Sequence, residues 1–173
     1  MTTPSTLSER FRSQRSDRIR VDETEVLSMV ELVLEPDSSL EVIVESARKD
    51  VAQGLSLRTK TAVMSVRRSP DDPETSGDEI EIVDTEVQYV QLPGAPIRSE
   101  IEGPDDVEAI VKVWNTWRLG DSDHAWTGNC GIIVEELEAP AGAQWRKRLW
   151  CSDGLGDPSF DDLVVLLTIG ERI

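Results

Sequence analysis

Short apolar runs rich in β-branched residues recur along this chain, and turn-favouring residues separate them. Residues 26–34 read Val-Leu-Ser-Met-Val-Glu-Leu-Val-Leu and are followed by glutamate, proline and aspartate. Such a run, closed by turn residues, predicts a β-strand. Runs of similar character predict strands at 57–68, 79–92, 128–138 and 145–152. The chain is therefore expected to build a sheet.

Residues 57–68 and 79–92 predict a long hairpin. The segment between them contains Pro70, Pro73 and Gly77 and is expected to be a loop. The alternation of the second strand slips at Val83, which is typical of a β-bulge. Earlier in the chain, 40–45 favours a strand, and 46–54 predicts a short helix closed by Gly54.

Residues 104–118 predict an amphipathic helix. Pro104 suits a first helical position, and the two aspartates that follow complement the helix dipole. Apolar residues then recur at spacings of three and four, and Gly120 ends the run. They are Val107, Ile110, Val111, Trp114 and Trp117. We expect this stripe to pack on the sheet.

The strands at 128–138 and 145–152 are expected to form a hairpin that turns between Ala139 and Gln144. This hairpin brings Cys130 toward Cys151. Two buried thiols are the main expectation, and a disulfide is the alternative. Residues 159–162 resemble a capping box, whereas 163–169 favour a buried strand, so we expect a short turn that leads into a strand.

These elements predict an α+β fold. It has an antiparallel or mixed sheet of about six strands, one confident helix on that sheet, and a basic N-terminal arm. Residues 1–20 are expected to form the arm, and 21–173 a single domain. No apolar run approaches the roughly 18 residues of a membrane helix. The first twenty residues lack the apolar central region of a signal peptide, so we expect cytoplasmic synthesis and no membrane partner.

The charge inventory is lopsided. The chain has 34 acidic residues against 14 Arg and 4 Lys, which gives a net charge of −16. Arginine pairs with carboxylates in bidentate geometry, which lysine does not reproduce. Two explanations account for this composition. One is adaptation to high salt, because salt screens the repulsion between carboxylates. The other is codon bias in a GC-rich genome, which replaces lysine by arginine.

The first twenty residues carry a net charge of +3 on a body of −19. A basic arm on an acidic body can contact a neighbouring copy, bind nucleic acid, or remain a solvated tail. We expect the partner-binding residues to be Arg10, Arg12, Arg15, Arg18, Arg20, Arg67 and Arg68.

Candidates for chemistry are few. His124 is the only histidine, and it follows the predicted helix without a recognised nucleophile motif. A weak candidate for a hard-cation site is the acidic segment that holds Asp153, Asp157, Asp161 and Asp162. The order of these residues does not match an EF-hand. We expect no cofactor, and we identify no small-molecule substrate.

The favoured hypothesis is a non-enzymatic subunit of a larger symmetric complex, namely a virion component of the head, connector or tail. It would associate with itself or with neighbouring subunits. The alternative is a small binding or regulatory module that contacts an acidic partner or nucleic acid through the Arg-rich N-terminus. An enzyme with an oxygen-ligated metal is the third hypothesis.

Overall fold

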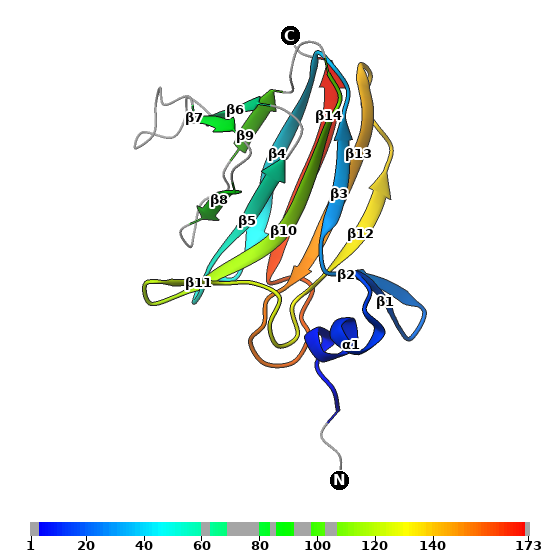
Figure 1. Ribbon diagram of the computed structural model, residues 1–173, viewed down its shortest axis with the longest axis vertical. Helices are drawn as coiled ribbons and strands as arrows, with labels where there is room; N and C mark the ends of the chain where they lie inside the picture. Colours follow the sequence, from blue (N-terminus) through cyan, green and yellow to red (C-terminus); the bar gives the residue numbers. More distant parts are fainter. Residues whose placement is uncertain are drawn as a thin grey trace.

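The chain forms two antiparallel sheets that pack face to face (Figure 1). The computed structural model describes residues 4–59, 63–68, 80–83, 86–91, 98–102 and 107–171, with side chains for 4–58 and 107–171. Over these residues the fold is mostly antiparallel sheet with one short helix, α1 (Leu7–Gln14). The predicted α+β class is confirmed in this coarse form, but the prediction of a single sheet of about six strands is wrong, because the described residues form 14 strands in two sheets.

The larger sheet has nine strands among the described residues. In spatial order they are β1 (Arg18–Val21), β2 (Thr24–Leu27), β12 (Gly131–Leu137), β13 (Ala143–Ser152), β14 (Leu163–Glu171), β4 (Ser38–Ala47), β9 (Arg98–Glu102), β6 (Val63–Arg68) and β7 (Ile80–Val83).

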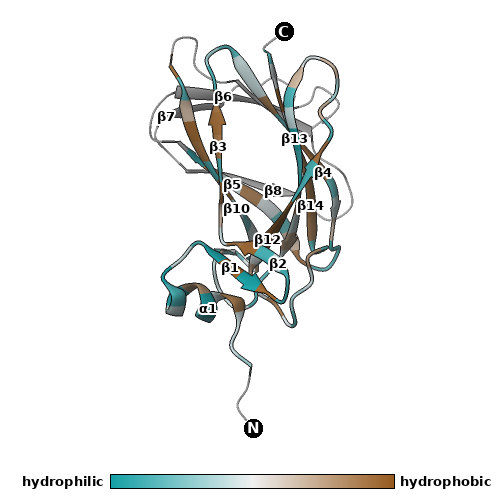
Figure 2. Cartoon of the chain, turned by 90° about the vertical axis from the view of Figure 1, so that its right-hand side faces the viewer, coloured by the Kyte–Doolittle hydropathy of each residue, from teal (hydrophilic) through white to brown (hydrophobic). Residues whose placement is uncertain are grey.

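The smaller sheet is centred on β10 (Ala109–Leu119). Its other strands are β3 (Val30–Leu34), β11 (Ser122–His124), β5 (Ala52–Thr59) and β8 (Glu86–Gln91). Strand β10 pairs with β5 along one edge and with β3 and β11 along the other. Figure 2 shows the two sheets facing each other, with α1 and the β1–β2 hairpin at one end of the molecule.

The main core lies between the sheets. Alternate residues of β3, such as Leu32 and Leu34, and of β10, such as Val111, meet side chains of β4 and β14 such as Val42 and Val165. All five are buried almost completely. Burial of one face of each sheet supplies the main driving force for this arrangement.

The predicted helix at 104–118 is wrong over its described part, because residues 109–119 form β10. Its apolar stripe is not one face of the element, since Val107 and Ile110 are exposed whereas Val113 and Asn115 are buried. Strand β10 lies inside its sheet and is buried on both faces from Val113 to Trp117. A strand buried on both faces loses its alternation and imitates a helical stripe.

Two of the predicted strands change sheets part-way. The run 26–34 divides into β2 and β3, and the run 57–68 divides into β5 and β6. The hairpin prediction is confirmed, because β6 pairs with β7 and β5 pairs with β8. Its two halves lie in different sheets. The expected loop at 69–78 lies outside the described residues, and the slip at Val83 falls where β7 ends.

Strands β12 and β13 confirm the C-terminal hairpin, and β14 confirms that a turn leads into a strand. The short helix expected at 46–54 is wrong, because β4 continues to Ala47 and β5 begins at Ala52. Within the described residues, no helix has the length and apolar character needed to cross a membrane.

Candidate functional site

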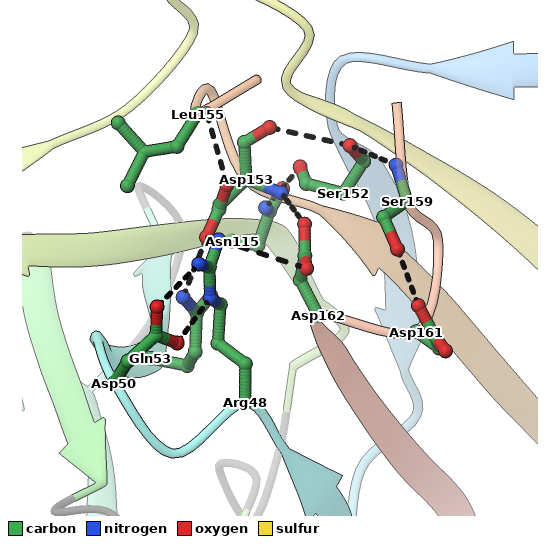
Figure 3. A network of polar contacts seen from close by, with 10 residues as sticks. All are labelled: Arg48, Asp50, Gln53, Asn115, Ser152, Asp153, Leu155, Ser159, Asp161 and Asp162. Atoms are coloured by element: carbon green, nitrogen blue, oxygen red, sulfur yellow. Dashed lines mark hydrogen bonds and ion pairs between the residues drawn. The ribbon is translucent and has the colours of Figure 1, made fainter. Parts of the chain in front are cut away.

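A buried network of polar side chains holds the loops at the α1 end of the sandwich (Figure 3). Asp153 follows β13 and is fully buried. Its Oδ2 accepts hydrogen bonds from Arg48 Nη1 at 3.0 Å and from Gln53 Nε2 at 2.8 Å. Its Oδ1 accepts one from the Leu155 amide at 2.9 Å. A buried carboxylate is tolerated here because it is paired and hydrogen-bonded.

Asp162 belongs to the same network and closes the other end of the loop. Its Oδ2 accepts a hydrogen bond from the Asp153 amide at 3.0 Å, and its Oδ1 lies 3.8 Å from Arg48 Nη1. Burial raises the pKa of Asp162 to about 6, and this effect outweighs the hydrogen bond and the nearby guanidinium. Two hydrogen bonds from Arg48 lower the pKa of Asp50 and raise that of Arg48.

This network differs from the expected cation site. Asp153 and Asp162 do lie together, but a guanidinium occupies the place where a cation would bind. Asp157 and Asp161 are exposed, and Asp161 accepts a hydrogen bond from the Ser159 hydroxyl. Among the described residues, no group of three ligating side chains could hold a metal ion. Asp153 and Asp162 therefore order a loop in this structure.

The loop that follows Asp153 packs closely against a second loop, residues 127–130, where Gly128 meets Gly154. Gly128 has a φ of +57°, and a Cβ on it would lie 2.1 Å from the carbonyl oxygen of Gly154. Only glycine combines this backbone conformation with so close an approach. Asn129 Nδ2 also donates to the Gly156 carbonyl at 2.8 Å. The network thus fixes the position of residues 127–130.

Residues 127–130 hold α1 against the sandwich. The Ser8 amide donates to the Gly128 carbonyl at 3.0 Å, and the Leu7 amide donates to Asn129 Oδ1 at 3.1 Å. Thr6 and Glu9 form a capping box at the start of the helix. A small cluster of buried apolar side chains lies beneath it, formed by Leu7, Ile19 and Val26.

The expected arm is therefore folded over its described residues. Residues 4–20 are not a free tail, because α1 and β1 contribute buried side chains and backbone hydrogen bonds to the body. The spacing of Thr6 and Glu9 is the Thr-x-x-Glu pattern of a capping box and indicates the start of a helix. The arm was instead predicted from the basic charge of the first twenty residues.

A pocket of about 450 Å³ lies between α1 and the loop before residue 127, and we call it the α1 pocket. Its apolar lining comes from Phe11, Met29, Trp126 and Cys130. Two guanidinium side chains line it as well, Arg12 and Arg15. The remaining lining residues are Ser8, Ser16, Asp17 and Ser28. An apolar concavity with a few convergent polar groups is typical of a ligand or partner site.

Trp126 is the most unusual residue of the pocket. Its φ is +54°, a left-handed conformation that bulky residues rarely adopt and that costs about 1–2 kcal/mol. Its ring contacts that of Trp114 in a tilted arrangement, with centroids 4.8 Å apart and the ring planes at 31°, and its Nε1 donates to the Ser28 carbonyl at 3.1 Å. Even so, 45% of Trp126 is exposed. Strained residues of this kind cluster at functional sites, which makes Trp126 a candidate functional residue.

The predicted arginines divide into two groups. Arg10, Arg12, Arg15, Arg18 and Arg20 lie in or next to α1 and β1, and we call them the α1 arginines. Arg67 and Arg68 lie at the end of β6, where the described part of the structure does not include side chains.

Within the described part of the chain, most α1 arginines lack a carboxylate partner. Among the described residues only Arg18 forms an ion pair, with Glu25 at 3.3 Å, and both side chains are exposed. Arg12 Nε donates to the Ser8 carbonyl at 3.4 Å. Elsewhere, arginines do pair with carboxylates: Arg148 with Glu45, Arg118 with Asp123, and Arg48 with Asp153. Arg10 and Arg20 donate to the backbone carbonyls of Arg20 and Glu23, which do not neutralise their charge. Guanidinium groups without a carboxylate on so acidic a chain are available to an external anion.

The remaining candidates for chemistry have structural surroundings. His124 stacks on Trp117 with ring centroids 6.2 Å apart, and no described serine or aspartate forms a hydrogen bond with it. Cys130 and Cys151 are buried and free, not joined in a disulfide. Burial raises the pKa of Cys130 to about 11 and that of Cys151 well above its ordinary value. Neither thiol has the lowered pKa of a reactive cysteine.

The sequence analysis did not single out Trp126. It lies in the polar segment between His124 and Gly128, outside every periodic run. A large aromatic residue isolated in a loop was the available signal, because such residues are often positioned to make contacts.

Comparison of the chain with family models, with curated proteins and with solved structures finds no match.

Proposed function

We propose that this protein is a non-enzymatic binding component of a larger assembly, and that it docks on an acidic protein surface through the α1 arginines. The observation that supports this proposal is the lack of carboxylate partners for Arg10, Arg12, Arg15 and Arg20 among the described residues, on a chain with 34 acidic side chains. Arginine recognises carboxylates by paired hydrogen bonds, so an acidic protein surface suits this group.

An acidic protein is a better partner for this surface than nucleic acid. Outside the first twenty residues the chain carries a net charge of −19, and this body repels a long polyanion that extends past α1. A local acidic patch on a protein avoids that repulsion. The carboxylate-rich body of a second copy is the nearest such surface, and the virion setting expected from the sequence belongs to the same proposal.

Binding to two polyanions tests the proposal. A short labelled poly-L-glutamate, which reaches the α1 arginines without extending along the acidic body, and a duplex DNA of about 20 base pairs are titrated with the full chain at several salt concentrations. We expect poly-L-glutamate to bind more tightly, with an affinity that falls as salt rises. The variant with Arg12→Glu and Arg15→Glu should lose most of this affinity. Arg58→Glu, an exposed arginine on β5, makes the same kind of charge change away from α1 and should retain it.

Each other outcome has a clear meaning. Tighter binding of DNA would replace the acidic-protein proposal with nucleic-acid binding. An absence of binding to either polymer at about 0.05 M salt would refute docking through the α1 arginines. Light scattering after size exclusion, over a range of protein concentrations, shows whether the acidic partner is a second copy.

A further inference from the structure

The α1 pocket adds an apolar site to the basic surface. Phe11 on α1 and Met29 and Trp126 on the body line the same concavity as Arg12 and Arg15. A surface that only attracted charge would have no need of an exposed tryptophan held in a left-handed conformation. The α1 pocket has a volume of about 450 Å³, which lies within the range of roughly 300 to 1,000 Å³ that small-molecule sites span.

We propose that the α1 pocket binds one large apolar side chain of an acidic peptide segment, while Arg12 and Arg15 pair with carboxylates on either side of that residue. This inference rests on the proposed function and specifies the chemistry of the partner. The apolar anchor contacts Trp126, Phe11 and Met29. Because the pocket has both an apolar lining and guanidinium groups, it discriminates against a segment that has only one of the two properties.

The geometry explains why these two arginines are suited to this role. Arg12 uses its Nε to contact the Ser8 carbonyl, which leaves its other guanidinium nitrogens free to donate. Arg15 is the C-cap of α1, has a φ of 49°, and pairs with no described carboxylate. The one carboxylate of the lining, Asp17, already accepts a hydrogen bond from the Ser28 hydroxyl at 3.1 Å. The pocket therefore presents net positive charge around an apolar centre.

The pocket is also preorganised. The Asp153 network, the contact between Gly128 and Gly154, and the hydrogen bonds from α1 fix both of its walls before a partner arrives. A preformed site loses less conformational entropy on binding than one that must order itself. Such a site can bind a short segment whose contacts are few.

Three blocked pentapeptides test the inference with the full chain. The first is Glu-Asp-Phe-Asp-Glu, the second has glycine in place of phenylalanine, and the third has lysine in place of each acid. Fluorescence anisotropy of labelled peptides measures the affinities. Burial of a phenylalanine side chain should make the first peptide bind about tenfold or more tightly than the second. The lysine peptide should bind most weakly.

Variants assign the effect to the pocket. Trp126→Ala should remove the preference for phenylalanine over glycine. Met29→Gln should do the same without a change at the strained position. Arg12→Glu with Arg15→Glu should weaken both acidic peptides. Leu119→Ala changes an apolar residue outside the pocket that is 41% exposed, and it should have no effect.

The outcomes separate the two proposals. Equal binding of the phenylalanine and glycine peptides would refute the apolar anchor and leave acidic docking intact. A preference that persists in both Trp126→Ala and Met29→Gln would also refute it, because the anchor would then bind elsewhere. If neither acidic peptide binds and poly-L-glutamate also fails to bind, acidic docking itself is refuted.

Discussion

Replacement of Asp162 by asparagine tests which of two opposing effects controls a carboxyl group in the loop network. Burial favours the neutral acid, whereas Arg48 at 3.8 Å favours the carboxylate. Burial is the larger effect, so the pKa rises from 3.8 to about 6. Asparagine resembles the neutral acid, retains an oxygen for the Asp153 amide, and cannot ionise.

The sign of the pH dependence follows from this shift. Because the folded state binds the proton more tightly than the unfolded chain, the contribution of Asp162 to stability is present below pH 3.8 and is lost as the pH rises through 6. A tenfold change in proton affinity corresponds to about 1.4 kcal/mol, so the full difference is about 3 kcal/mol. Solvent reaches the network along Arg48, which is 26% exposed, and reduces this to about 2 kcal/mol.

Urea unfolding of both proteins between pH 4 and pH 7 measures the effect. The free energy of unfolding of the native chain, minus that of Asp162→Asn, should fall by about 1.5 to 2 kcal/mol over this range. Asp161→Asn is the matched control, because it removes an exposed carboxylate at the adjacent position. If the difference instead rises with pH, Arg48 and not burial controls Asp162, and our account of the network is wrong.

Three further predictions concern packing, buried charge and salt. Gly128→Ala should destabilise the fold by about 3 kcal/mol, because Gly128 has a left-handed φ and lies close to the Gly154 carbonyl. Calorimetry should then show a melting temperature lower by about 6 to 12 °C. Asp153→Ala should lower the free energy of unfolding, measured in urea, by about 3 kcal/mol, because it removes the buried partner of Arg48. An effect below about 1 kcal/mol would show that Asp50 alone is a sufficient partner for Arg48. If the acidic composition reflects adaptation to salt, the melting temperature should be higher in about 2 M than in about 0.1 M KCl, and equal values would favour codon bias.

The elements that sequence reasoning placed correctly depend on local signals. The β12–β13 hairpin turns at a segment of alanine, proline and glycine, and β14 follows a polar turn, so neighbouring residues define both. Strand β10 was assigned as a helix because it is buried on both faces, and that depends on its strand neighbours. The change of sheet between β2 and β3 left no turn signal at Ser28 and Met29.

The site was harder to predict than the fold, because its parts come from distant positions. Arg48 and Asp153 are 105 residues apart, and no spacing rule connects them. Of the four loop carboxylates that the sequence suggested, Asp153 and Asp162 lie together, and the cation beside them is the guanidinium of Arg48. The basic charge of the first twenty residues was visible, whereas the pocket beside it requires Trp126, which only the fold brings close to α1.

The attachment of α1 to residues 128 and 129 has a consequence for biosynthesis. The Leu7 amide and the Asn129 side chain are 122 residues apart, and β2 pairs with β12. At about 5 to 20 residues per second, a ribosome needs on the order of 6 to 24 s to make the intervening chain. During that time Ile133 and Phe160 are not yet made, so the cluster of Leu7, Ile19 and Val26 lacks part of its native cover. The N-terminal segment is therefore made well before its partner strand β12 and should complete its packing only after β12 is made. A nascent chain stalled before β12 should be a good substrate for chaperones that bind apolar segments.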